Sequence, residues 1–169
     1  MPGALYQYLA DDHKRLDDCL QRAAASPHEL DTTAHAQFRA GLLRHIGIEE
    51  KILLPSVQQS LGSKPLPLIT QIRLDHAALA ALLVPPPTRG IIAAIRAILT
   101  KHNELEENQG GLYEIIERLT RDELNTLLEK ARSAPEVRAL PHNAGPNVLK
   151  ATRRALARAG YDLSDYESN

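Results

Sequence analysis

The sequence predicts an all-α fold: an up-down-up-down antiparallel four-helix bundle with additional short C-terminal helices. Apolar residues recur at steps of three and four along most of the chain, and the strict alternation typical of strands is absent. Aromatic residues make up 4% of the 169 residues, so the core must consist mostly of Leu, Ile and Ala, which favours packed helices. The links between the first four helical segments are short, which places consecutive helices antiparallel.

The first two helices are expected at roughly residues 3–25 and 31–60. The chain turns between them at "ASPHELDT". Ser26 has capping-box spacing to Glu29, and Asp31 is a competing N-cap for the second helix.

The third and fourth helices are expected at roughly 66–84 and 89–118. "LGSKPLP" marks the turn before the third helix, and "PPPTRG" ends that helix because proline cannot continue it. Thr88 is positioned to cap the fourth helix, and Gly110 and Gly111 are expected to loosen it locally.

The C-terminal part is expected to add helices to the bundle. Thr120 opens a capping box, "TRDE", for a short helix, and a basic amphipathic helix follows at about 147–159. We interpret the basic run as a solvated helix face or a docking helix. The expected organisation is a bundle over residues 1–120 and a helical extension over 121–169, packed on the same domain.

Each of the four main helices carries one histidine in its apolar stripe, and the second and fourth also carry a glutamate four residues later, on the same face. These residues are His13, His45, Glu49, His76, His102 and Glu106. Mid-helix positions of antiparallel helices meet at one level, and a buried carboxylate without a partner costs several kcal/mol. Imidazole and carboxylate suit iron, manganese or zinc, and two bridging carboxylates suit a metal pair. We interpret the six residues as metal ligands; the alternative is that they satisfy one another by hydrogen bonds.

The remaining polar candidates near these stripes have other expected roles. His28, His35 and His142 are expected to be solvated surface residues. Glu50 and Glu107 follow the stripe glutamates and point about 100° away, so solvation or hydrogen bonding to a ligand is expected rather than ligation.

Tyr6 and Tyr113 share the faces of His13 and Glu106 at a spacing of about two turns. We expect both tyrosines to pack in the core, with pocket lining as the alternative, and Gln109 is a further pocket candidate. Cys19 is expected to be a small buried residue.

Charge and cysteine usage limit the class of protein. The formal net charge of −1 gives no sign of nucleic-acid or anionic-membrane binding. One cysteine excludes a disulfide within the chain, the N-terminus is too polar for a signal peptide, and no apolar run is long enough to span a membrane. We therefore expect a cytoplasmic protein.

The chain resembles the hemerythrin-like (HHE cation-binding) family over roughly residues 5–120. "DDHKRLDD", "RHIGIEEKILLP", "IRLDHAAL" and "KHNELEENQGGLY" are similar to the histidine segments of that family's four helices. The resemblance implies a non-haem di-iron centre with an oxo or hydroxo bridge, in which His13 and His45 bind one iron and His76 and His102 the other, while Glu49 and Glu106 bridge.

Two positions differ from the oxygen-carrying hemerythrins. Those proteins have a further histidine one turn after the third-helix histidine, where this chain has Ala80, and an aspartate where it has Glu106. The set of four histidines and two glutamates looks more like the di-iron proteins of iron–sulfur cluster repair and nitrosative stress.

The resemblance and the residues together predict a di-iron protein that binds or senses a small ligand such as O₂ or NO. The alternative is an iron-handling or regulatory module whose metal is structural and whose C-terminal region binds a protein partner or a second copy of the chain. The sequence leaves enzyme activity open, and manganese or zinc are accepted by the same ligands.

Overall fold

The computed structural model describes residues 2–62 and 64–167, and the regular structure of these residues is helical throughout. The elements are α1 (Ala4–Ala23), α2 (Thr32–Ile48), η1 (Glu49–Leu53), α3 (Leu54–Leu61), α4 (Pro67–Leu82), α5 (Arg89–Glu107), α6 (Leu112–Leu119), η2 (Arg121–Glu123), α7 (Leu124–Arg132), α8 (Pro146–Ala159) and α9 (Ser164–Glu167). The all-α prediction is confirmed. Among residues 2–62 and 64–167, no helix has both the length and the apolar character needed to cross a membrane.

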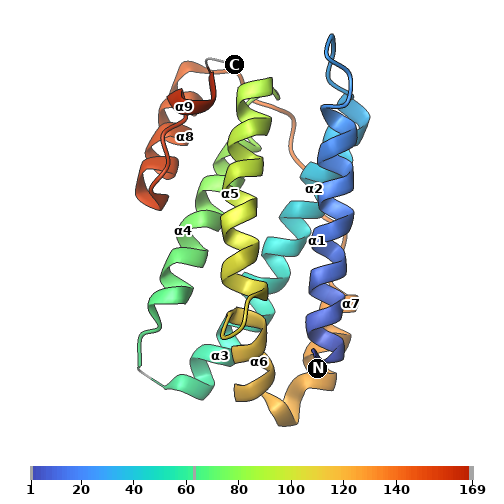
Figure 1. The fold of residues 1–169 in the computed structure, drawn as a ribbon, viewed down its shortest axis with the longest axis vertical. Coiled ribbons are helices and arrows are strands. Elements are labelled where there is room, and N and C mark those ends of the chain that lie inside the picture. Colours follow the sequence, from blue (N-terminus) through green and yellow to red (C-terminus); the bar gives the residue numbers. More distant parts are fainter. Residues whose placement is uncertain (1, 63, 168–169) are drawn as a thin grey trace.

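Helices α1, α2, α4 and α5 lie lengthwise beside one another (Figure 1). Helix α1 packs against α2, α4 packs against α5, and α1 also contacts α5. The later helices cover the outside of this group: α7 lies against α1, α8 runs along α4, and α9 contacts α5.

Two of the expected helix caps are present and one is absent. The Asp31 carboxylate accepts from the Ala34 amide, so Asp31 rather than Ser26 begins α2. The Thr88 hydroxyl accepts from the Ile91 amide and caps α5 as predicted. The prediction of a capping box at Thr120 is wrong, because the Thr120 hydroxyl donates to the Ile116 carbonyl instead of accepting from a backbone amide of the following turn.

The long second helix contains a π-helical turn, η1, directly at Glu49. A π turn holds more residues than an α turn, so the buried face shifts by one position beyond it. Leu53 is fully buried, whereas Ile52, which continues the spacing of three and four residues from His45 and Glu49, is half-buried. The period of 3.6 residues could not predict this shift.

The fourth helix is broken between Glu107 and Leu112, so the predicted single helix over 89–118 is wrong. Gly110 has φ of 79°, a conformation that favours glycine. A Cβ on Gly111 would lie 2.7–2.8 Å from backbone carbonyl oxygens of residues 105, 106 and 108. The break leaves Gln109 exposed to solvent, so its assignment to the pocket is also wrong.

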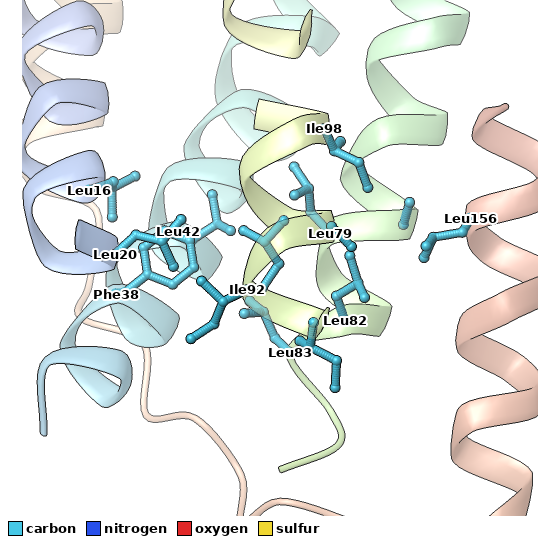
Figure 2. Close-up of a cluster of buried hydrophobic side chains, with 14 of the residues drawn as sticks. Leu16, Leu20, Phe38, Leu42, Leu79, Leu82, Leu83, Ile92, Ile98 and Leu156 are labelled. Carbon is cyan, nitrogen blue, oxygen red and sulfur yellow. The ribbon is translucent and has the colours of Figure 1, made fainter. Parts of the chain in front are cut away.

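Two separate apolar clusters form the core. The first (Figure 2) lies between α1, α2, α4 and α5 and includes Leu16, Leu20, Phe38, Leu42, Leu79, Leu82, Ile92 and Ile98. The second includes Leu5, Leu9, Ile48, Leu53, Ile72, Leu112, Tyr113 and Ile116. On each long helix, the histidine of the stripe lies in sequence between residues of the two clusters, so a polar layer separates two apolar ones.

His35 is buried, with 1% of its surface exposed, so its prediction as a surface residue is wrong. The irregular segment 134–145 passes over the start of α2 and brings the ring of His142 to 5.8 Å from that of His35. The Arg39 side chain donates to the carbonyls of Leu83 and Leu140 and fixes this segment. Burial, with the charges of His142 and Arg39, lowers the pKa of His35 to about 4. His28 and His142 are exposed, and Cys19 is buried, as predicted.

Candidate metal centre

The six residues expected to bind metal lie together in the layer between the two apolar clusters. None has more than 6% of its surface exposed, and both glutamates are fully buried. They come from four helices and the π turn: His13 from α1, His45 from α2, Glu49 from η1, His76 from α4, and His102 and Glu106 from α5. We call them the inner cluster.

One half of the inner cluster surrounds the Nε2 atoms of His13 and His45, which lie 3.0 Å apart. His13 Nε2 is 3.3 Å from Glu106 Oε2, and His45 Nε2 is 3.4 Å from Glu49 Oε1. Ligand atoms of His13, His45 and Glu106 therefore lie within 4.8 Å of one another, and Glu49 Oε1 joins them beside His45 Nε2.

The other half uses the second oxygen of each glutamate. His76 Nε2 lies 3.0 Å from Glu49 Oε2, and His102 Nε2 lies 3.2 Å from Glu106 Oε1. Ligand atoms of these four residues all fall within 4.8 Å of one another. Each glutamate thus spans both halves, which is how a carboxylate bridges two metal ions.

The opposite ring nitrogen of every histidine faces a carboxylate outside the inner cluster. The Nδ1 pairs are His13 with Glu107 (2.6 Å), His45 with Asp12 (2.9 Å), His76 with Glu50 (2.7 Å) and His102 with Asp75 (3.4 Å). A carboxylate accepts, so Nδ1 donates, and this assigns the tautomer in which a neutral ring turns the lone pair of Nε2 inward. Ligand histidines in metal proteins are held in the same way. We call these four residues the outer carboxylates.

The site repeats itself with approximate two-fold symmetry. The pair α1–α2 and the pair α4–α5 each supply an Asp-His on the first helix, a histidine on the second, and a Glu-Glu four residues later. Corresponding contacts match: His13 to Glu107 and His76 to Glu50 measure 2.6 and 2.7 Å. The other two contacts match less closely: His45 to Asp12 measures 2.9 Å and His102 to Asp75 measures 3.4 Å.

Glu50 and Glu107 hydrogen-bond to His76 and His13, as expected from their positions. The equivalent roles of Asp12 and Asp75 were missed. Each aspartate directly precedes a stripe histidine, but it bonds to the histidine of the next helix. The recurring Asp-His and Glu-Glu pairs were the signal that could have revealed them.

The inner cluster carries strongly perturbed pKa values. Burial opposes protonation of His45 and His102, but neighbouring carboxylates outweigh it and raise the pKa of each histidine to about 10. The carboxylates are Glu49 and Asp12 beside His45, and Glu106 and Asp75 beside His102. Burial likewise opposes ionisation of Glu49, yet the charges and hydrogen bonds of the histidines hold its pKa well below the usual value. The cluster therefore favours positive charge next to its glutamates.

Three inner atoms lack any hydrogen-bond partner among the described residues: Glu49 Oε2, His76 Nε2 and Glu106 Oε1. In the neutral form of each ring, an imidazole lone pair at Nε2 faces carboxylate lone pairs at close range, and at His45 and His102 the raised pKa keeps a proton there in the metal-free protein. Such acceptors repel one another unless a cation lies between them. The donor set and its orphaned atoms fit metal ions.

Tyr113, in the first turn of α6, reaches this site from the second apolar cluster. Its hydroxyl lies 2.9 Å from Glu49 Oε1 and 3.1 Å from Glu106 Oε2. Burial and these two carboxylates raise the pKa of Tyr113 well above its usual value. Tyr6 packs edge-on against Tyr113, but its hydroxyl donates away from the cluster, to the Glu107 carbonyl. The expected core packing of Tyr113 is confirmed, and its hydroxyl in addition reaches the inner cluster.

A cavity of about 330 Å³ between α1 and α5 reaches the inner cluster from the surface. His13 and Glu107 lie in its wall, together with Thr100 and Asn103. The Asn103 Oδ1 atom is buried and has no hydrogen-bond partner among the described residues. The cavity gives a small polar molecule a path to His13.

Comparisons with protein-family models, with curated proteins and with solved structures found no match to this chain. The functional argument therefore rests on the site itself: a buried group of histidines and glutamates that could hold metal.

Proposed function

We propose that this chain is a hemerythrin-like, non-haem di-iron protein that binds or senses a small ligand such as O₂ or NO. Its four long helices form the up-down-up-down bundle of that family, and the inner cluster holds the metal pair. His13 and His45 bind one iron, His76 and His102 bind the other, and Glu49 and Glu106 bridge them.

One observation carries the proposal: each of the four histidines donates Nδ1 to its own outer carboxylate and turns Nε2 toward a shared pair of glutamates. Hydrogen bonding within the cluster accounts for this arrangement only in part, since buried atoms of Glu49, His76 and Glu106 make no well-aligned hydrogen bond. A protein that needed the cluster for stability alone would gain by replacing it with apolar side chains.

The surroundings support a small ligand. Bound iron would supply open coordination positions and electrons, and the protein supplies the enclosure. Apolar clusters cover the site on both sides, and the cavity between α1 and α5 opens to it beside His13. Apolar surroundings with one narrow cavity admit a small molecule to the site and keep bulk water away from it.

The test is the metal content per chain of freshly purified protein, measured together with its ultraviolet–visible spectrum. We expect about two irons per chain and charge-transfer absorption that changes with dithionite, azide or NO. Bound metal with a spectrum that ignores these ligands would favour a structural metal in a regulatory module. No bound metal, and none taken up from added iron(II), would refute the proposal.

A further inference from the structure

One difference between the two halves of the inner cluster is that Tyr113 lies beside the His13–His45 half. Its hydroxyl oxygen is 3.1 Å from His13 Nε2 and 3.4 Å from His45 Nε2, in addition to its contacts with Glu49 and Glu106. No phenol contacts the other half among residues 2–62 and 64–167. The position equivalent to Tyr113 by the approximate symmetry is Ser56, whose hydroxyl donates to the Ile52 carbonyl.

Hydrogen bonding alone does not account for the place of this hydroxyl. A phenol has one proton to donate. Around it are two carboxylate oxygens and two imidazole nitrogens, and Glu107 and Asp12 direct the protons of those rings to Nδ1. One donated bond serves one of these atoms, so the phenol oxygen lies close to more polar atoms than its single proton can serve.

The distances instead match the edges of a coordination sphere. Metal bonds to imidazole nitrogen and carboxylate oxygen are about 2.0 to 2.2 Å long, so neighbouring ligand atoms lie about 2.8 to 3.1 Å apart in octahedral and about 3.4 Å apart in tetrahedral geometry. The contacts of the Tyr113 oxygen span 2.9–3.4 Å. The His13–His45, His13–Glu106 and His45–Glu49 contacts measure 3.0, 3.3 and 3.4 Å.

We propose that Tyr113 is a ligand of the metal at the His13–His45 position, bound as a phenolate. This inference rests on the proposed metal centre and makes the two positions unequal: five protein ligands at one and four at the other. On binding, the phenol loses its proton to solvent and the oxygen lone pair forms the bond to the metal. A six-coordinate ion then keeps one open position on the Tyr113 side and two on the other.

The break between α5 and α6 serves this arrangement. Helix α5 ends at Glu107, and Gly110 and Gly111 let α6 begin with Tyr113 in its first turn. The Tyr113 ring also stacks on that of His13, with centroids 5.8 Å apart, and Tyr6 supports it from the other side.

The test compares Tyr113→Phe with Tyr6→Phe and the unchanged protein, each loaded with iron(II) without oxygen and then oxidised in air. Tyr6→Phe is the matched control, because it removes a neighbouring hydroxyl that points away from the cluster. We expect a phenolate-to-iron(III) absorption band in the visible region for the unchanged protein and for Tyr6→Phe, and none for Tyr113→Phe. Zinc titration of Tyr113→Phe should show one of two metals bound at least about tenfold more weakly.

Each outcome decides between the proposals. Two bound irons without a phenolate band in the unchanged protein would overturn the role of Tyr113 and leave the metal centre standing. A chain that takes up no iron would overturn both. If Tyr113→Phe does not fold, resonance Raman spectra of the unchanged protein with ring-deuterated tyrosine replace it: bound phenolate shifts its ring vibrations, and an unshifted spectrum contradicts the ligation.

Discussion

Removing the charge of one outer carboxylate should weaken one metal position and leave the other unchanged. Glu50 holds His76 at 2.7 Å, and Glu107 holds His13 at 2.6 Å, so Glu50→Gln and Glu107→Gln act on opposite halves of the site. Loss of such a partner typically costs 10–100-fold in metal affinity, or about 1.4–2.8 kcal/mol. Because both side chains are about one-third exposed, the metal-free protein should lose at most about 1 kcal/mol.

The assay is a competitive zinc titration against a chromophoric chelator, analysed with two binding constants. Each single variant should lower one constant, and the double variant both. Glu104→Gln, a change at an exposed glutamate of α5, is the matched control and should lower neither. If Glu50→Gln and Glu107→Gln leave both constants within about twofold of the unchanged protein, these carboxylates do not orient metal ligands, and the reasoning from them is wrong.

Four further predictions test the site. His76→Ala should abolish binding at its metal position, seen as a loss of metal per chain by elemental analysis, whereas His28→Ala, at an exposed position, should retain the full content. Zinc uptake at pH 8 should release protons to an indicator dye, because the metal-free protein holds His45 and His102 protonated up to a pKa of about 10 and metal requires their neutral form. The same raised pKa values also stabilise the metal-free fold. This contribution is fully present below the ordinary histidine pKa of about 6.5 and is lost as pH rises through about 10. Thermal melts across that pH range would detect the loss of stability. Thr100→Trp places a bulky ring in the wall of the cavity between α1 and α5 and should slow azide binding in stopped-flow measurements without changing the metal content; an unchanged rate would assign entry to another path.

The sequence predicted the helices and the inner cluster because both depend on local spacing. A histidine in an apolar stripe, followed by a glutamate four residues later, stays on one face of its helix whatever lies around it. Four helices with such a histidine, two of which also carry the glutamate, pack together and bring these polar residues to one layer. The inner cluster was therefore predictable residue by residue, as His13 and Glu106 illustrate.

The remaining features depend on contacts between distant parts of the chain. The π turn at Glu49 and the break after Glu107 interrupt helices whose apolar period continues through them. His35 is buried by a segment about one hundred residues later in the chain, which no local pattern of α2 reveals. Asp12 appeared as one more charged residue of α1, since its partner, His45, belongs to another helix.

The approximate symmetry of the site has a consequence for how the protein is made. Neither helical pair alone contains a complete binding position, because His13 and His45 need Glu106, and His76 and His102 need Glu49. On the ribosome, the first hairpin emerges long before residue 106, so a nascent chain offers an incoming ion an incomplete set of donors. On the proposed metal centre, a complete set of donors exists only after synthesis has passed α5, so metal binding would stabilise the finished fold rather than its first half.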